Sequence, residues 1–245
     1  MLSICYSVKN RTNLKTKHGE ISLLPKSIKS VEDAMKGIGV PYEIIVADWQ
    51  SRDTDYAWFD VSSKSDLKRN KLVSINSNQV FQDFSDDFYY SDTAFSRGYG
   101  LNMAAKVSRY KHLLFLDADM LVTQDFLVRC LSATIKDNIY FPICWYLTEE
   151  DRHMAQECLG NEDLPDTMYE SKREKEEDDF PETSGWQIGG MGICAITNDT
   201  WSSVHGWPEY AGWGGEDLHF ADGLRLKGHH SKFVRQNDVG LMRQW

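Results

Sequence analysis

Two aspartates, one residue apart, directly follow the apolar run 113–116. Four apolar residues in succession predict a buried strand of a parallel sheet, with Asp117 and Asp119 at its carboxyl end. Alternation along an extended chain points both carboxylates to one side. Like charges held close together repel each other unless a cation neutralises them, and hard oxygen ligands suit Mn²⁺ or Mg²⁺. The pair predicts a metal and phosphate site, the alternative being two solvated aspartates at a strand end.

Polar residues also follow two other predicted strands. Asn10 and Arg11 leave the strand 2–8, where an amide and a cation suit a phosphate or a base edge, unless this is only a solvated loop. The strand 43–48 ends in Asp48, whose carboxylate can accept from a base N–H or a ribose hydroxyl. A strand–helix–strand unit with this ending is typical of nucleoside binding. The sequence has neither a Gly-x-Gly-x-x-Gly turn nor a Walker phosphate loop.

The second half of the chain gathers glycines, aromatic residues and acids. Residues 186–196 form a glycine-rich entry into an apolar strand, where a ligand can approach the backbone closely. Residues 206–217 combine tryptophans and glycines with Glu216 and Asp217. Flat aromatic faces beside carboxylates are typical of sugar binding, although Asp217 could instead be a helix N-cap.

The pattern of elements predicts an α/β fold with a mostly parallel sheet flanked by helices. We expect strands at 2–8, 43–48, 71–75, 113–116, 139–145 and 232–235, and helices at 24–38, from about 95 to 110, at 126–135 and from about 217 to 228. Arg97 and Asn102 lie in the second helix and are placed to reach the strand ends, or else are surface residues. Pro142 indicates that its strand is an edge strand or has a bulge.

Composition restricts the function further. The 245 residues are 41% hydrophobic, enough for one large α/β domain. Residues 149–182 hold 14 acidic and 4 basic residues, which accounts for the whole formal net charge of −10. The balanced remainder argues against a nucleic-acid partner. The acidic insert, about 149–184, is either a lid or a solvated insertion.

The five cysteines are odd in number and include no Cys-x-x-Cys pair, which argues against zinc and redox motifs. Cys5, Cys144 and Cys194 lie in apolar runs and are predicted to be buried thiols. No leader pattern and no apolar stretch of transmembrane length is present. A cytoplasmic protein is therefore expected, unless the chain is an excised domain. Its oligomeric state cannot be predicted.

Taken together, these segments resemble inverting glycosyltransferases of the GT-A fold, which is Rossmann-like. The similarity is to β-1,4-galactosyltransferases, polypeptide N-acetylgalactosaminyltransferases and chondroitin-type polymerases. It runs from residue 2 to about 243 and leaves the acidic insert unmatched. Its most specific piece is 212–217, which reads Gly-Trp-Gly-Gly-Glu-Asp. The resemblance implies one catalytic domain, 1–245, with a nucleotide-binding half at 1–119 and an acceptor-binding half at 120–245.

The resemblance also implies a role for each matching residue. Nucleotide contacts are implied for Asn10, Arg11, Asp48, Phe95 and Arg97. Asp117 matches a residue near the ribose and donor sugar, Asp119 a metal ligand, and Gly189 and Gly190 the loop beside the donor sugar. Trp213 and Glu216 match acceptor-binding residues. Asp217, with Glu216 beside it, matches the catalytic base.

A third metal ligand is harder to match. The galactosyltransferases place a metal-binding Met and His after the last strand, where this chain has Met242 and then Gln244 or Trp245. In the polypeptide transferases a metal-binding His precedes Val-Gly, and here Asp238 stands in that place. We therefore expect Asp238 to join Asp117 and Asp119, with His230 as the second candidate.

The predicted function is metal-dependent, inverting transfer of galactose or an N-acetylhexosamine from a UDP-sugar to a hydroxyl of a glycan or other acceptor. Mn²⁺ or Mg²⁺ is the expected cofactor. Three alternatives stay open at this point: a sugar-1-phosphate nucleotidyltransferase, a retaining transferase, and a non-catalytic sugar- or partner-binding module on the same fold.

Overall fold

The computed structural model describes residues 1–16, 19–61, 68–76, 95–146, 186, 190–210 and 214–244. The predicted site residues Gly189 and Trp213, the terminal Trp245 and nearly all of the acidic insert lie outside these ranges. The strands are β1 (Leu2–Val8), β2 (Asn13–Thr16), β3 (Gly19–Ser22), β4 (Tyr42–Asp48), β5 (Lys68–Ser74), β6 (His112–Phe115), β7 (Met120–Val122), β8 (Ile139–Tyr146), β9 (Cys194–Thr197) and β10 (Phe233–Arg243). The helices are α1 (Leu23–Ile38), α3 (Arg97–Lys106), α4 (Gln124–Ile135), α7 (Asn198–Ser203), α8 (Glu216–Leu226) and the 3₁₀ helix η3 (His229–Lys232).

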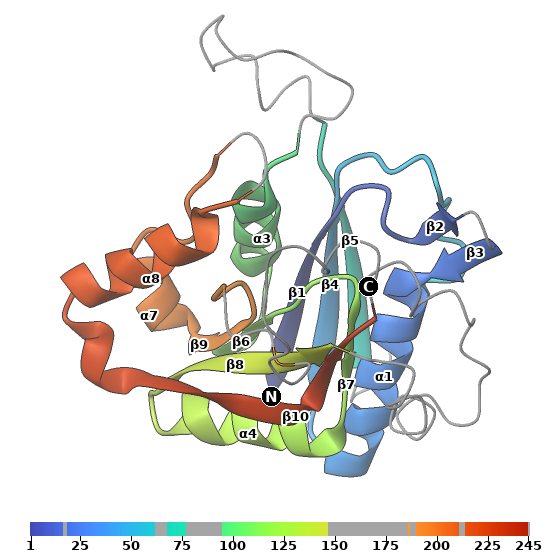
Figure 1. The fold of residues 1–245 in the computed structure, drawn as a ribbon. Coiled ribbons are helices and arrows are strands. Elements are labelled where there is room, and N and C mark those ends of the chain that lie inside the picture. The colour runs from blue at the N-terminus through green and yellow to red at the C-terminus, as the bar shows by residue number, and fades with distance from the viewer. Residues whose placement is uncertain are drawn as a thin grey trace, which may run out of the picture.

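One eight-stranded sheet organises the molecule, in the order β5-β4-β1-β6-β9-β8-β10-β7 (Figure 1). Strands β5, β4, β1 and β6 are parallel to one another, and β10 is parallel to β8. Strand β9 runs antiparallel to β6 and β8, and β7 antiparallel to β10. The expected α/β fold with a mostly parallel sheet is confirmed. Both halves of the chain contribute strands to this sheet.

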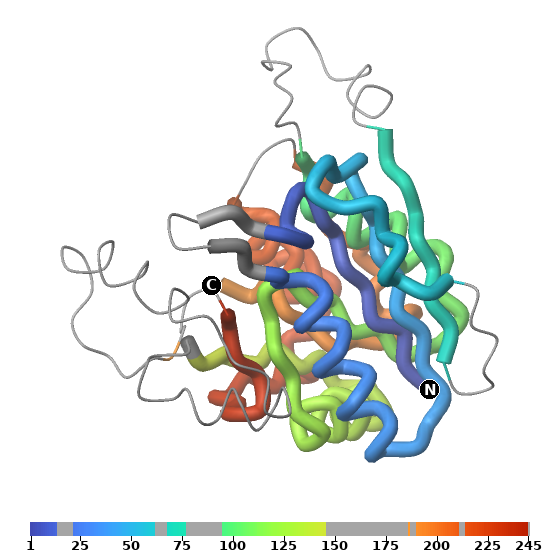
Figure 2. The backbone as a smooth tube through the Cα atoms, turned by 90° about the vertical axis from the view of Figure 1, so that its right-hand side faces the viewer, coloured from blue at the N-terminus to red at the C-terminus, as the bar shows by residue number. Residues whose placement is uncertain are grey.

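Helices cover both faces of the sheet. Alternate residues of β1 point to opposite faces, so Ile4 and Tyr6 pack with α1 and α4 while Cys5 packs with α3 and α8. Figures 1 and 2 show α1 against one side of the strands, with α3, α7 and α8 on the other. Because the strands are covered on both faces, they read as continuous apolar runs, which is why the sequence predicts them well.

Strand β10 is longer than the expected strand 232–235. It runs beside β8 as far as Asn237, shifts register, and resumes pairing at Met242. Its end then pairs antiparallel with β7, where Arg243 lies opposite Met120. The Gln244 N–H donates to the Asp119 carbonyl oxygen at 2.7 Å. The irregular stretch therefore returns the chain to the two aspartates.

Asp238 holds this register shift in place and is not arranged as a metal ligand. Its fully buried carboxylate accepts from the Arg129 guanidinium on α4, from the Tyr140 hydroxyl and from the Gly240 N–H. Both oxygens are thus bonded on the α4 side of the sheet. The prediction that Asp238 joins Asp117 and Asp119 is corrected by this placement, because its side chain faces structural partners instead.

Pro142 does not mark an edge strand, because β8 lies between β9 and β10. The structure pairs β8 with β9 only at Tyr140 and Ala195. Pro142 follows that pair, so its missing N–H costs the sheet no hydrogen bond to β9. The register shift indicated by proline lies on the neighbouring β10.

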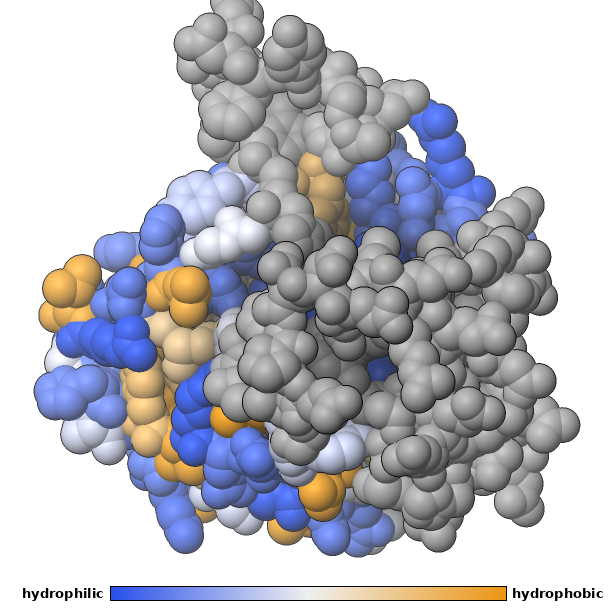
Figure 3. Space-filling view, viewed as in Figure 1, coloured by the Kyte–Doolittle hydropathy of each residue, from blue (hydrophilic) through white to orange (hydrophobic). Residues whose placement is uncertain are grey.

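The described part of the surface is mainly hydrophilic on the face shown in Figure 3, with hydrophobic residues scattered between. Among the residues that the structure describes, none of the helices has the length and apolar character needed to cross a membrane. Cys5, Cys144 and Cys194 are buried thiols as expected, and so is Cys130.

Gly98 allows α3 to approach the segment before α8. A Cβ at this position would lie 1.9 Å from the Pro208 carbonyl oxygen, so Gly98→Ala must displace backbone. We expect a loss of about 1–3 kcal/mol in the free energy of unfolding, measured by urea denaturation. Gly223→Ala on α8 is the matched control, because its Cβ would meet nothing nearer than 4.0 Å. The control should gain stability, by at most about 1 kcal/mol. Equal effects of the two substitutions would contradict the close approach.

Arg129→Met tests the structural role of Asp238. The substitution leaves a buried carboxylate without its cation, so we expect a loss of at most about 3–5 kcal/mol, reduced because Arg129 is partly exposed. The double variant Arg129→Met with Asp238→Leu should be more stable than Arg129→Met alone, because the orphaned charge is gone. Urea denaturation measures both. A double variant no more stable than the single one would show that Asp238 does not depend on Arg129.

Candidate active site

The Asp117 carboxylate lies between two arginines. The Leu116 N–H donates to the Cys5 carbonyl oxygen, which extends the β1–β6 pairing and brings Asp117 to the carboxyl end of both strands. Oδ1 accepts from Arg97 Nε at 2.8 Å, and Oδ2 accepts from Arg243 Nη2 at 3.1 Å. Burial raises the pKa of Asp117, but the two guanidinium groups outweigh it and the net shift is downward. Asp117 is therefore held ionised.

Asp119 shares Arg243 with Asp117. Arg243 Nε lies 3.6 Å from Asp119 Oδ2, so both carboxylates approach one guanidinium. The prediction that the two side chains face the same region is confirmed by this common contact. Burial, and then repulsion from Asp117, raise the pKa of Asp119, while Arg243 and Arg11 lower it in part. The site thus favours additional positive charge near Asp119.

Arg97 connects the aspartates with the second half of the chain. Besides Asp117, its guanidinium donates to the Gly192 carbonyl oxygen at 2.7 Å and lies 3.7 Å from Glu216 Oε1. It also lies over the Trp207 ring, 5.2 Å from the centroid. Only 7% of its side chain is exposed. The predicted nucleotide side and acceptor side of the site therefore meet at this residue.

Asn102 fixes the segment that precedes α8. Its amide nitrogen donates to the Trp207 carbonyl oxygen and to Glu209, both at 2.8 Å, and its amide oxygen accepts from the Trp207 N–H. Asn102 is buried rather than a surface residue. Asn102 therefore positions the backbone of this segment.

Asp217 stands in the first turn of α8, and its carboxylate reaches the strand entry before β9. The N-cap is Gly215, in the left-handed region at φ 84°, so Asp217 is not the cap. Asp217 Oδ2 accepts from the Met191 N–H at 2.6 Å. Gly190 is also left-handed, at φ 79°, and a Cβ there would lie 3.2 Å from the same oxygen. Glycine at 190 therefore permits the approach of Asp217.

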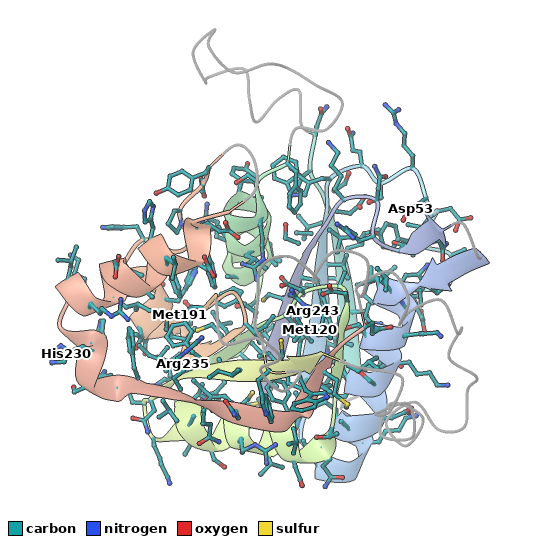
Figure 4. The ribbon with its side chains drawn as sticks, in the orientation of Figure 1. Asp53, Met120, Met191, His230, Arg235 and Arg243 are labelled. Carbon is teal, nitrogen blue, oxygen red and sulfur yellow. The ribbon has the colours of Figure 1, made fainter. Side chains whose placement is uncertain are left out.

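Arg235 borders this part of the site and was not singled out in the sequence. It donates to the Gly190 carbonyl oxygen at 3.0 Å. Figure 4 shows Met191 and Arg235 close together, with Arg243 farther to the right and His230 at the left edge of the molecule. His230 belongs to η3 beyond α8, so it does not join Asp119 as a metal ligand.

The predicted base-binding residue Asp48 ends β4 beside the loop after β1. Its carboxylate accepts from the Tyr56 hydroxyl at 2.9 Å and from the Ser51 N–H at 3.1 Å. Asn10 is left-handed at φ 50°, and its side-chain oxygen accepts from the Arg52 N–H at 2.8 Å. Asp48 and Asn10 are therefore joined through the turn after β4.

Two further residues complete this end of the sheet. Asp53 accepts from the N–H groups of Thr12 and Asn13, at 2.7 and 2.9 Å, and so ties the loop after β1 to the turn after β4. Phe95 packs edge-on against Trp49, with ring centroids 5.8 Å apart. The predicted nucleotide-binding residues thus surround one set of strand ends.

Sequence reasoning missed Arg243, Asp53, Tyr56 and Arg235. Arg243 lies between Met242 and Gln244, which are both buried. Alternation along a strand leaves the residue between two buried ones facing the other way. The sequence does not mark the polar Gln244 as buried, so only the pairing of β10 with β7 shows that Arg243 faces the aspartates. The turn residues after β4 carry no local signal either.

The side chains around Asp117 and Asp119 do not match the ligand set of a divalent cation site. Within the described ranges, no three His, Cys, Asp or Glu side chains come together as a metal site. Asp117 has a guanidinium on each oxygen, and Asp119 Oδ2 faces Arg243. A cation bound there would lie against like charge, and with two protein carboxylates it would depend on water and substrate for its other ligands.

Comparison with known proteins agrees with this architecture. Residues 61–245 match the family model of chondroitin N-acetylgalactosaminyltransferase. Chondroitin sulfate N-acetylgalactosaminyltransferase 2 of Mus musculus is 28% identical over 190 residues, which cover 76% of this chain. The chain spans 30% of the length of that relative.

Solved structures show the same fold at low identity. S. aureus TarS, in complex with UDP-GlcNAc, has a TM-score of 0.55 and 14% identity, covering 98% of this chain and 57% of TarS. Glucosyl-3-phosphoglycerate synthase of Mycobacterium tuberculosis, in complex with Mn²⁺, UDP and glucosyl-3-phosphoglycerate, has a TM-score of 0.52 and 13% identity, covering 99% of this chain and 71% of the synthase. The expected GT-A fold is confirmed. The chain belongs to the chondroitin N-acetylgalactosaminyltransferase family.

Proposed function

We propose that this domain transfers a sugar from a UDP-sugar to a hydroxyl of a glycan, with inversion at the anomeric carbon. The observation that carries the proposal is the meeting of the two halves at Arg97, which contacts both Asp117 and Glu216. A donor and an acceptor bound on the two sides would therefore face each other across one buried guanidinium. Family membership supports N-acetylgalactosamine as the sugar, within the galactose or N-acetylhexosamine class expected from the sequence.

The donor side is proposed at the carboxyl ends of β1, β4 and β6. Asp48 accepts from the base or ribose, with Asn10 and Phe95 beside it, and Arg11 and Arg97 lie near the diphosphate. Ligands of open α/β sheets bind outside the carboxyl ends of the strands, which supports this placement. The lowered pKa of Asp117 keeps it charged and able to accept from ribose or donor-sugar hydroxyls.

Asp217 is proposed as the catalytic base. As the acceptor oxygen attacks the anomeric carbon, Asp217 takes the hydroxyl proton, a new C–O bond forms, and the bond from the anomeric carbon to the diphosphate oxygen breaks. UDP leaves with the bonding pair on the face opposite the attack. The Met191 N–H holds one carboxylate oxygen of Asp217 and fixes its direction, and Gly190 gives it room. Glu216 and Trp213 remain proposed acceptor contacts, and Gly189 a proposed donor-sugar contact.

The expectation of Mn²⁺ or Mg²⁺ rests on Asp117 and Asp119, since Asp238 and His230 lie elsewhere. A structural neighbour contains Mn²⁺ together with UDP. The described donor set here does not match such a site, so no step of the proposed reaction depends on a metal. The cytoplasmic location expected from the sequence stays a prediction.

Asp217→Asn tests the proposed base. We expect the variant to bind UDP-GalNAc normally in a thermal-shift assay, because Asp217 faces the acceptor rather than the nucleotide. Transfer to a chondroitin-type acceptor should fall about 10²–10⁴-fold, since the acceptor hydroxyl loses its proton acceptor. Proton NMR of the wild-type product should show inverted, β anomeric configuration.

Asp222→Asn is the matched control, because Asp222 is an exposed acid on the same helix, paired with Arg225. It should leave transfer unchanged. Unchanged transfer by Asp217→Asn would remove Asp217 as the base. Product of α configuration would overturn inversion, and a folded wild-type protein that binds no UDP-sugar would overturn the proposed function itself.

A further inference from the structure

Arg243 occupies the position between the two aspartates. Its guanidinium approaches Asp117 Oδ2 at 3.1 Å and Asp119 Oδ2 at 3.6 Å, and 18% of its side chain is exposed. Arg243 is therefore partly exposed at the edge of the proposed donor site. Figure 4 shows Arg243 at the end of β10, beside Met120 of β7.

The backbone around Arg243 is held on both sides. Met242 and Arg243 pair with Leu121 and Met120 of β7, and the Gln244 N–H donates to the Asp119 carbonyl oxygen. The buried Gln244 side chain donates to the Leu23 carbonyl oxygen at 3.3 Å. A long cationic side chain anchored in this way has little freedom to leave the aspartates, so its charge is a fixed part of the site.

We propose that Arg243 binds the diphosphate of the UDP-sugar and neutralises it in place of a divalent cation. This inference rests on the proposed function and concerns the same site. The donor's diphosphate would meet Arg243 at the position where the sequence predicted Mn²⁺ or Mg²⁺. Donor binding would then be independent of metal.

The charges of the described residues support this assignment. Asp117 and Asp119 supply two negative charges, and Arg97 and Arg243 supply two positive charges in direct contact with them. The carboxylate repulsion that would call for a metal is therefore offset by arginines already in contact with both aspartates, although Arg97 is also shared with Glu216.

The chemistry of the guanidinium suits the role. Its five N–H donors spread in one plane, so a guanidinium can contact carboxylates and phosphate oxygens together. The aspartates orient the guanidinium and hold it in place before the donor arrives. As the bond to the anomeric carbon breaks, the charge that grows on the leaving diphosphate oxygen meets a cation already in position.

Binding of UDP to the full chain, measured by isothermal titration calorimetry, separates arginine from metal. In EDTA the wild-type protein should bind UDP, and replacing EDTA by Mn²⁺ should change the dissociation constant by less than about threefold. Arg243→Gln should weaken binding in EDTA by about 10–100-fold, because charge-assisted hydrogen bonds to phosphate are lost. Added Mn²⁺ should strengthen UDP binding by this variant, because Asp119 and the Oδ2 atom of Asp117 no longer face a guanidinium.

Arg225→Gln is the matched control, an exposed arginine on α8 whose loss should leave UDP binding unchanged. Arg243→Lys should retain part of the affinity for UDP in EDTA, since lysine keeps the positive charge but lacks the planar set of guanidinium N–H donors. Thermal unfolding checks that each variant is folded, and wild-type binding that requires Mn²⁺ would overturn the assignment without any variant.

Each outcome is decisive. UDP binding by the wild type in EDTA, lost in Arg243→Gln, supports the assignment. UDP binding by the wild type only with Mn²⁺ overturns it, while leaving the proposed sugar transfer in place. Equal affinities of wild type and a folded Arg243→Gln in EDTA also overturn it. Failure of the folded wild type to bind UDP under either condition overturns the proposed function, and this inference with it.

Discussion

The ion pairs of Asp117 with Arg97 and Arg243 are the contact on which the site depends. Three segments far apart in the chain meet at this carboxylate: the end of β6, the start of α3 and the end of β10. A half-buried carboxylate is costly unless its charge is compensated, so the fold must bring both arginines to it. The position of α3 against the sheet and the course of β10 within it therefore determine the arrangement of charges around Asp117.

Two features of the packing make that meeting possible. Gly98 lets α3 lie close to the segment before α8, so that Arg97 reaches both Asp117 and Glu216. The register shift in β10, held by the buried pair of Asp238 and Arg129, turns the strand end back toward β7 and carries Arg243 to the aspartates. The buried pair of Asp238 and Arg129 is thus structural, and it supports the position of the pair formed by Arg243 and Asp117.

The sequence predicts the fold well where strands are fully buried. Runs such as those of β1, β4 and β6 are apolar on both faces, and their boundaries match the structure to within about three residues. The prediction fails where pairing depends on distant partners. The end of β10 contains Asn237 and Gly240, which read as a turn, and only pairing with β8 and β7 extends it as a strand. The short β7, which pairs with the end of β10, was missed for the same reason, and the local hairpin of β2 and β3 was missed as well.

Local pattern was enough to determine the α/β class, the strand ends that carry Asp48 and Asp117, and the acids at the start of α8. Each of these features depends on residues adjacent in the chain. The tertiary structure alone decided which charges meet. Asp238 pairs with Arg129, and Arg243 pairs with Asp117 and approaches Asp119. Both residues belong to one irregular strand, and a shift of register redirects each side chain, so their partners cannot be read from local spacing.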